Sequence, residues 1–124
     1  MPVRRSVFVV DDDPSMRTGI RRLLSVHGFH SELFESADAL LCHQDFGEAL
    51  CLVLDINLNG ESGIDLCRSL LDKGERVPVI YITGNDSEAN RAAARASGCV
   101  AYLTKPFAGL SLIESIEKAR STTA

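Results

Sequence analysis

The chain has 124 residues, of which 45% are hydrophobic and 24% are charged; this composition is that of a folded globular protein and excludes a disordered one. A chain of this length can bury roughly two-thirds of the surface that its unfolded state exposes, which predicts one domain over residues 1–124. The formal net charge of −4 argues against a nucleic-acid-binding surface, because such a surface needs a dense positive face.

Short apolar runs alternate with helical patterns along the chain. The runs predicted as strands cover residues 7–10, 29–34, 49–54, 77–82 and 100–103, and the second alternates in polarity, as an edge strand does. Helical spacing of apolar residues follows each run, over residues 14–28, 36–41, 64–74, 86 or 87 to 98, and 112–116. This order predicts an α/β fold, in which a parallel sheet carries helices on both faces.

Acidic side chains gather where two of these strands end. Asp11, Asp12 and Asp13 follow the first strand and Asp55 follows the third. Because ligands of open parallel sheets bind at the carboxyl ends of the strands, we expect these carboxylates to converge. Clustered carboxylates repel one another, and a hard cation such as Mg²⁺ suits their oxygen atoms. Asp11, Asp12 and Asp55 are the expected ligands, whereas we interpret Asp13 as a helix cap.

Two more polar residues follow the remaining strands of this edge. Lys105 offers a point positive charge for a phosphate oxygen, and Thr83 offers a hydroxyl donor. An acidic metal site with these groups suits phosphoryl transfer, in which an aspartate can be the nucleophile. Two alternatives stay open. An aspartyl-nucleophile phosphohydrolase needs a cap over its substrate, for which the sequence shows no residues, and an interaction module would take no phosphate at all.

Four segments together resemble the receiver domains of two-component response regulators. They read Val-Val-Asp-Asp-Asp-Pro-Ser (residues 9–15), Leu-Val-Leu-Asp-Ile-Asn-Leu-Asn-Gly (52–60), Ile-Thr-Gly (82–84) and Leu-Thr-Lys-Pro-Phe (103–107). The likeness covers essentially the whole chain and rests on the order and spacing of the motifs. It implies a doubly wound, flavodoxin-like sheet of five parallel strands in the order 2-1-3-4-5, flanked by five helices.

The resemblance implies a role for each matching residue of the acidic cluster. Asp55 would accept the phosphoryl group and also ligate Mg²⁺, for which Mn²⁺ would substitute. Asp11, Asp12 and the backbone carbonyl of Asn57 would complete the metal ligands. The side chains of Asn57 and Asn85 stand where relatives tune dephosphorylation.

The same resemblance implies the parts that respond to phosphorylation. Thr83 and Lys105 would each bind a phosphoryl oxygen, Tyr102 would change rotamer on activation, and the Lys105–Pro106 bond would be cis. Two positions depart from the family pattern: Asn59 stands where proline is common, and Glu61 stands where an apolar residue is common.

The resemblance also implies partners and a mode of action. A sensor histidine kinase or a phosphotransfer protein would supply the phosphoryl group. The face built from the fourth helix, the fifth strand and the fifth helix would then control an output domain, a downstream protein or a second copy of the chain. The protein would be a regulatory switch that assists its own phosphorylation and dephosphorylation rather than an enzyme, with no direct contact to nucleic acid or membrane.

Cysteine usage favours a reducing compartment. None of the four cysteines forms a C-x-x-C pair, and Cys51 and Cys67 fall on apolar patterns typical of a core. We therefore expect a cytoplasmic protein, an expectation that the lack of a signal peptide or long apolar run supports. A redox role for Cys42 stays open, and we interpret the three histidines, at 27, 30 and 43, as surface residues.

Overall fold

The computed structural model describes residues 6–43, 46–47, 49–58 and 60–122, except the side chain of Thr122. Asn59, where the family pattern has proline, therefore lies outside the described residues. The elements in chain order are β1 (Ser6–Val10), α1 (Pro14–Val26), β2 (His30–Phe34), α2 (Ala37–Cys42), β3 (Ala49–Asp55), β4 (Asn57–Leu58), β5 (Glu61–Ser62), α3 (Gly63–Asp72), β6 (Val79–Thr83), α4 (Glu88–Ala96), β7 (Ala101–Thr104) and α5 (Gly109–Thr122).

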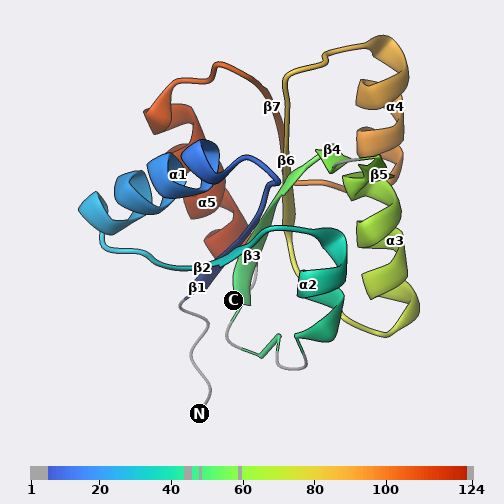
Figure 1. Ribbon diagram of the computed structural model, residues 1–124, viewed down its shortest axis with the longest axis horizontal. Helices are drawn as coiled ribbons and strands as arrows, with labels where there is room; N and C mark the ends of the chain where they lie inside the picture. The colour runs from blue at the N-terminus through green and yellow to red at the C-terminus, as the bar shows by residue number, and fades with distance from the viewer. Residues whose placement is uncertain (1–5, 44–45, 48, 59, 123–124) are drawn as a thin grey trace.

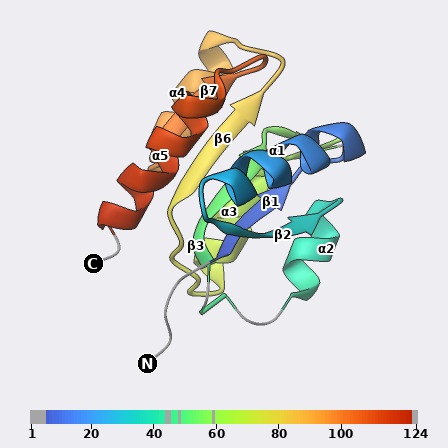
Figure 2. The same cartoon turned by 90° about the vertical axis from the view of Figure 1, so that its left-hand side faces the viewer.

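Within the described part of the chain, one parallel sheet has five strands in the order β2-β1-β3-β6-β7. Because β6 and β7 are the fourth and fifth strands of this sheet, the predicted order 2-1-3-4-5 is confirmed. Helices α1 and α5 lie on one side of the sheet and α2, α3 and α4 on the other (Figure 1). Figure 2 looks from the side of α1 and α5, which stand in front of the strands. The doubly wound fold with helices on both faces is therefore confirmed as well.

Alternating side chains of the strands feed the two cores of the molecule. From β1, Phe8 and Val10 pack toward α2 and α3, whereas Val7 and Val9 pack toward α1 and α5. The central strand β3 is buried along its whole length. This is why its apolar run is continuous in the sequence, while β2 at the edge alternates between exposed and partly buried residues.

A small antiparallel ribbon, which the sequence did not predict, follows the central strand. Asn57 pairs with Ser62 and Leu58 with Glu61, with Gly60 at φ 93° between them. Only glycine adopts such a φ readily, so the ribbon turns tightly. It brings the chain from the end of β3 directly into α3.

The interpretation of His43 as a surface residue is wrong. Its ring packs edge-on against Phe8, Phe34 and Phe46, with centroid distances of 5.1, 5.4 and 5.7 Å. Its Nε2 also lies 3.8 Å from Glu32 Oε2. Aromatic edge-to-face contacts of this kind stabilise a core, so an imidazole at the end of α2 is used here as an aromatic side chain.

Candidate functional site

The carboxyl ends of four strands meet at one edge of the sheet. Asp11 directly follows β1, Asp55 is the last residue of β3, Thr83 is the last residue of β6, and Lys105 directly follows β7. In Figure 1 this edge lies at the top, where β1 passes into α1 and β6 turns toward α4. Asp11 and Thr83 are fully buried and Asp55 is 5% exposed, so the polar groups of this edge lie inside the protein surface.

Lys105 bridges the two buried carboxylates. Its Nζ lies 2.8 Å from Asp55 Oδ2 and 3.0 Å from Asp11 Oδ2. Burial alone would lower the pKa of Lys105, but the hydrogen bonds to Asp55 and Asp11 outweigh it and raise that pKa. The amine therefore stays protonated and presents a positive charge between two oxygen atoms of different strands.

Asp11 is held by hydrogen bonds on both its side chain and its backbone. Asp13 N donates to its Oδ1 at 2.9 Å, and its own amide donates to Phe34 O at 3.2 Å. The Arg17 guanidinium donates to its carbonyl oxygen at 2.6 Å. Despite these partners, burial raises the pKa of Asp11 above its usual range. Sequence reasoning missed Arg17, because a basic residue on an exposed helix looks like part of a solvated face.

Asp55 is positioned by the ribbon that follows it. Asn57 N donates to Asp55 Oδ1 at 2.9 Å, and Gly63 N donates to Ile56 O at 2.8 Å. A Cβ built at Gly63 would lie well inside 3.0 Å of Asp55 O and 3.3 Å from Ile56 Cα. Residue 63 must therefore be glycine for α3 to start this close to the end of β3. The sequence-based reasoning had not assigned Gly63 a role.

The acidic side chains form a set that fits a hard cation. Among the described residues, Asp11, Asp12 and Asp55 each offer one carboxylate oxygen, and these oxygens lie within 4.8 Å of one another. Asp12 is exposed, so the set opens to solvent on one side. Asp13 does not join it: its carboxylate accepts from Ser15 N at 2.9 Å and caps α1, as predicted. Oxygen ligands with partial solvent access are what Mg²⁺ prefers.

The comparisons with known proteins agree with one another. The family model of the response regulator receiver domain matches residues 7–117. The chain belongs to this family. The receiver domain is 39% identical, over 87% of the chain, to the response regulator MprA of Mycolicibacterium vanbaalenii. The match covers 46% of MprA, so the chain spans about half the length of this curated relative.

Solved structures share the fold over nearly the whole chain. FixJ-N matches with a TM-score of 0.83 and 32% identity, covering 94% of each chain. The response regulator StyR matches with a TM-score of 0.85 and 35% identity, covering 97% of this chain and 61% of StyR. Receiver domains are regulatory parts of two-component systems, typically with Mg²⁺ at an acidic pocket. This family assignment places the chain among regulatory domains, which favours a signalling role over the phosphohydrolase alternative.

The buried hydroxyl of Thr83 lies at the start of the loop that leads from β6 to α4. Asn85 N donates to Thr83 Oγ1 at 3.0 Å, and Asn90 Nδ2 of α4 donates to Asn85 O at 2.8 Å. Lys105 N donates to Thr83 O at 2.7 Å. Thr83 is thus tied both to the lysine segment and to α4, while the side chains of Asn57 and Asn85 are exposed beside the cluster.

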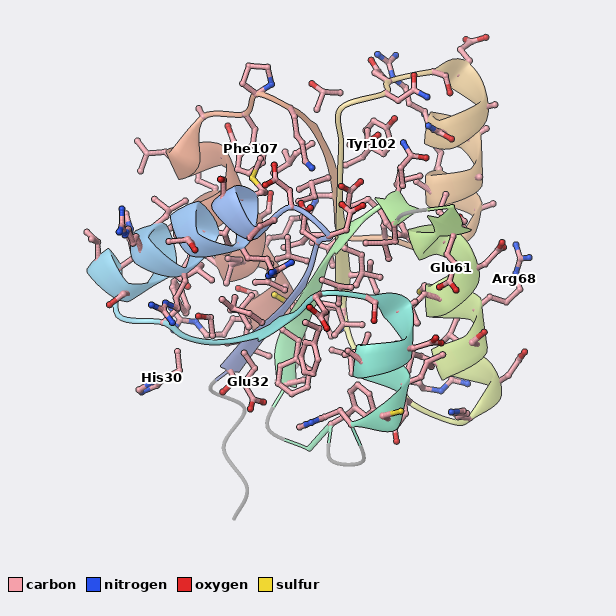
Figure 3. All side chains as sticks on the ribbon, viewed as in Figure 1. His30, Glu32, Glu61, Arg68, Tyr102 and Phe107 are labelled. Carbon is pink, nitrogen blue, oxygen red and sulfur yellow. The ribbon has the colours of Figure 1, made fainter. Side chains whose placement is uncertain are left out.

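Tyr102 lies outside the acidic cluster. Its ring stands between β6 and α4, on the other side of the sheet from Phe107 (Figure 3). Its hydroxyl donates to Asp86 Oδ1 at 3.1 Å, and the residue is only partly buried. The Lys105–Pro106 peptide bond between Tyr102 and α5 is cis. Glu61 lines a depression between α2 and α3 together with Asp38 and Asp65.

Among the described residues, no helix combines the length and the apolar character that crossing a bilayer requires.

Proposed function

We propose that Asp55 accepts a phosphoryl group in a Mg²⁺-dependent reaction and that the chain acts as a phosphorylation-activated signalling switch. The position of Lys105 carries the proposal. Its Nζ contacts Asp55 Oδ2 at 2.8 Å and Asp11 Oδ2 at 3.0 Å. A fixed cation beside the acceptor oxygen is suited to stabilise the charge that develops on a transferring phosphoryl group.

The phosphoryl donor in this proposal is a phosphohistidine on a sensor histidine kinase or phosphotransfer protein. A carboxylate oxygen of Asp55 attacks phosphorus and forms an O–P bond while the N–P bond breaks. The imidazole nitrogen leaves with the electron pair of that bond and takes a proton from water. Lys105 binds an equatorial phosphoryl oxygen, which keeps negative charge in place during transfer.

Mg²⁺, or Mn²⁺ in its place, would be held by the carboxylates of Asp11, Asp12 and Asp55, whose oxygens lie within 4.8 Å of one another, and by the backbone carbonyl of Asn57. When bound, the ion neutralises charge on phosphoryl oxygens and lets them approach a cluster of acids. The hydrogen bonds from Asp13 N and from the Arg17 guanidinium hold Asp11 in place for this role.

The new phosphoryl group adds about −1.5 to −2 charge at neutral pH. Thr83 Oγ1 accepts a hydrogen bond from Asn85 N, so its own hydrogen can be donated to a phosphoryl oxygen. Tyr102 then turns toward the space beside Thr83, which shifts a pre-existing equilibrium between two conformations. The exposed Asn57 and Asn85 side chains control the access of the water that ends the signal.

The face formed by α4, β7 and α5 is the proposed output surface. It would control an output domain, a downstream protein or a second copy of this chain. The curated relative MprA is about twice as long as the chain, which agrees with an output domain outside the receiver. With a net charge of −4, the receiver itself is a poor ligand for nucleic acid.

Intact mass spectrometry tests the acceptor. The protein is incubated with acetyl phosphate and Mg²⁺, beside Asp55→Asn and a control, Asp65→Asn, which removes an exposed carboxylate from the first turn of α3. We expect one added phosphoryl group on the wild type and on Asp65→Asn, and none on Asp55→Asn or without Mg²⁺. An adduct on Asp55→Asn would remove the assignment of Asp55.

A short-lived phosphoryl group would escape this assay, so beryllofluoride binding is measured on the same proteins. We expect a Mg²⁺-dependent complex with the wild type and with Asp65→Asn. If the wild type forms neither the adduct nor this complex, the chain is an interaction module that takes no phosphate.

A further inference from the structure

The loop between β6 and α4 carries an ion pair for which the phosphoryl chemistry has no use. Arg91 Nε donates to Asp86 Oδ1 at 2.8 Å, and Arg91 Nη2 donates to Asp86 Oδ2. Two parallel hydrogen bonds of this kind fix the carboxylate plane in one orientation. The oxygen Oδ1 then receives a third bond, from the Tyr102 hydroxyl at 3.1 Å. One exposed carboxylate therefore joins the start of α4 to β7.

The ionisation states of Asp86, Arg91 and Tyr102 favour the hydrogen bond from the Tyr102 hydroxyl to Asp86. The hydrogen bond from Arg91 holds the pKa of Asp86 below its usual range, so the carboxylate stays charged. Burial and the hydrogen bond to Asp86 raise the pKa of Tyr102, so the phenol keeps its proton. A charged acceptor facing a neutral hydroxyl makes a stronger bond than two neutral groups would.

Packing alone does not fix the Tyr102 ring. The ring lines a cavity of about 200 Å³, together with Arg91, Ala94, Arg95 and Cys99. Helix α4 beside it is alanine-rich, with Ala94 as its buried residue. A ring with open space on one side can adopt more than one rotamer, so its polar contact has a large share in deciding which rotamer is populated.

We propose that Asp86, oriented by Arg91, is a positioning residue that latches Tyr102 away from Thr83 and so sets the resting level of the switch. The inference rests on the proposed function, in which Tyr102 turns toward Thr83 after phosphorylation. Releasing the hydroxyl removes a bond that only the resting rotamer makes. The conformation that binds the phosphoryl group is then more populated before any phosphoryl group arrives.

The test measures beryllofluoride affinity with Mg²⁺ for the wild type, Asp86→Ala, Tyr102→Phe and the double variant. We expect Asp86→Ala to bind about three- to tenfold more tightly, which corresponds to the loss of one hydrogen bond in the resting state. In the Tyr102→Phe background the same substitution should change little, because the hydroxyl is already gone. Arg91→Met, which leaves the carboxylate unoriented, should shift affinity in the same direction.

The Asp65–Arg68 pair of α3 provides the matched control. Its atoms Nη1 and Oδ1 are 3.5 Å apart, and both side chains are largely exposed. Asp65→Ala should leave beryllofluoride affinity unchanged. Equal affinity of Asp86→Ala and wild type, or an equal gain in both Tyr102 backgrounds, would overturn the latch.

A second readout does not depend on phosphate chemistry. The chain has no tryptophan and two tyrosines, so Tyr81→Phe leaves Tyr102 as the only tyrosine, whose emission can be excited apart from that of phenylalanine. In that background we expect Asp86→Ala to lower quenching of Tyr102 by neutral acrylamide, since the ring turns inward. Unchanged or increased quenching would refute the latch. If the wild type binds no beryllofluoride, the proposed function fails. The quenching result alone then decides whether Asp86 holds the Tyr102 ring away from Thr83.

Discussion

Replacing Gly63 by alanine tests how the acceptor aspartate is positioned. The added Cβ would lie well inside 3.0 Å of Asp55 O, 3.1 Å from Asp55 C and 3.3 Å from Ile56 Cα. These are backbone atoms at the end of the central strand, so the helix must move rather than a side chain. Overpacking of this kind costs about 1–3 kcal/mol. The bond from Gly63 N to Ile56 O would be stretched at the same time, which costs about 1 kcal/mol more.

Gly19→Ala is the matched control within the same fold. No described atom beyond its own helix lies within 4 Å of a Cβ at Gly19, which is an exposed position inside α1. Alanine there should stabilise the protein by about 0.5–1 kcal/mol, because glycine in a helix interior carries an entropy penalty. A glycine-to-alanine substitution should therefore lower stability at Gly63 and raise it at Gly19.

Thermal and urea denaturation, followed by far-ultraviolet circular dichroism, measures both variants. We expect Gly63→Ala to lower the free energy of unfolding by about 2–4 kcal/mol, which lowers the Tm by roughly 10 °C. The Tm of Gly19→Ala should rise by a few degrees. Mg²⁺ should also raise the Tm of Gly63→Ala less than that of the wild type, because the strain falls on Asp55. A Gly63→Ala protein as stable as the wild type, with the same response to Mg²⁺, would refute the reasoning.

Three further predictions concern buried ionisable groups. Burial raises the pKa of Asp11, so its contribution to stability is present below its ordinary pKa of 3.8 and is lost as pH rises through the raised value. Without divalent cations, Asp11→Asn should therefore have a higher urea midpoint at neutral pH, yet lose the stabilisation by Mg²⁺; a lower midpoint would contradict this. Burial alone would lower the pKa of Lys105, but its hydrogen bonds to two carboxylates outweigh this and raise that pKa. The contribution of Lys105 to stability is therefore present below its ordinary pKa of 10.5 and is lost as pH rises through the raised value. The difference in unfolding free energy between wild type and Lys105→Met should therefore shrink as pH rises above 10.5. A difference that stays constant would argue against the bridge that Lys105 makes between Asp11 and Asp55. Burial raises the pKa of Cys51 to about 12, so peptide mapping after iodoacetamide should find exposed Cys42 modified first and Cys51 only on unfolding; labelling of native Cys51 would count against this core position.

The sequence was informative wherever a residue's place along the chain determined its place in space. Asp11, Asp55, Thr83 and Lys105 end or follow strands, and parallel strands bring their carboxyl ends to one edge. The strand order could be predicted with the family resemblance, and the cap role of Asp13 could be predicted from its position before Pro14.

Residues that act through the backbone, or across elements far apart in the sequence, could not be predicted. The Arg17 guanidinium donates to the backbone carbonyl oxygen of Asp11. Gly63 is required because any side chain at position 63 would clash with the backbone of Asp55. The contact between Asp86 and Tyr102 joins residues 16 positions apart. His43 was misread because two of the three phenylalanine rings that it contacts, Phe8 and Phe34, come from strands far from it in the sequence.

The two edges of the sheet bear on how copies of this chain could associate. An open strand edge invites pairing with another strand, and charged side chains or short edge strands discourage it. The β2 edge presents the exposed side chains of His30 and Glu32 (Figure 3). The β7 edge has four residues, and Pro106, which has no amide hydrogen to donate, follows shortly after it. Strand-to-strand fusion into a continuous sheet is therefore disfavoured at both ends. A second copy on the proposed face of α4, β7 and α5 would then be held by side-chain contacts, which can be made and released without unpairing a backbone.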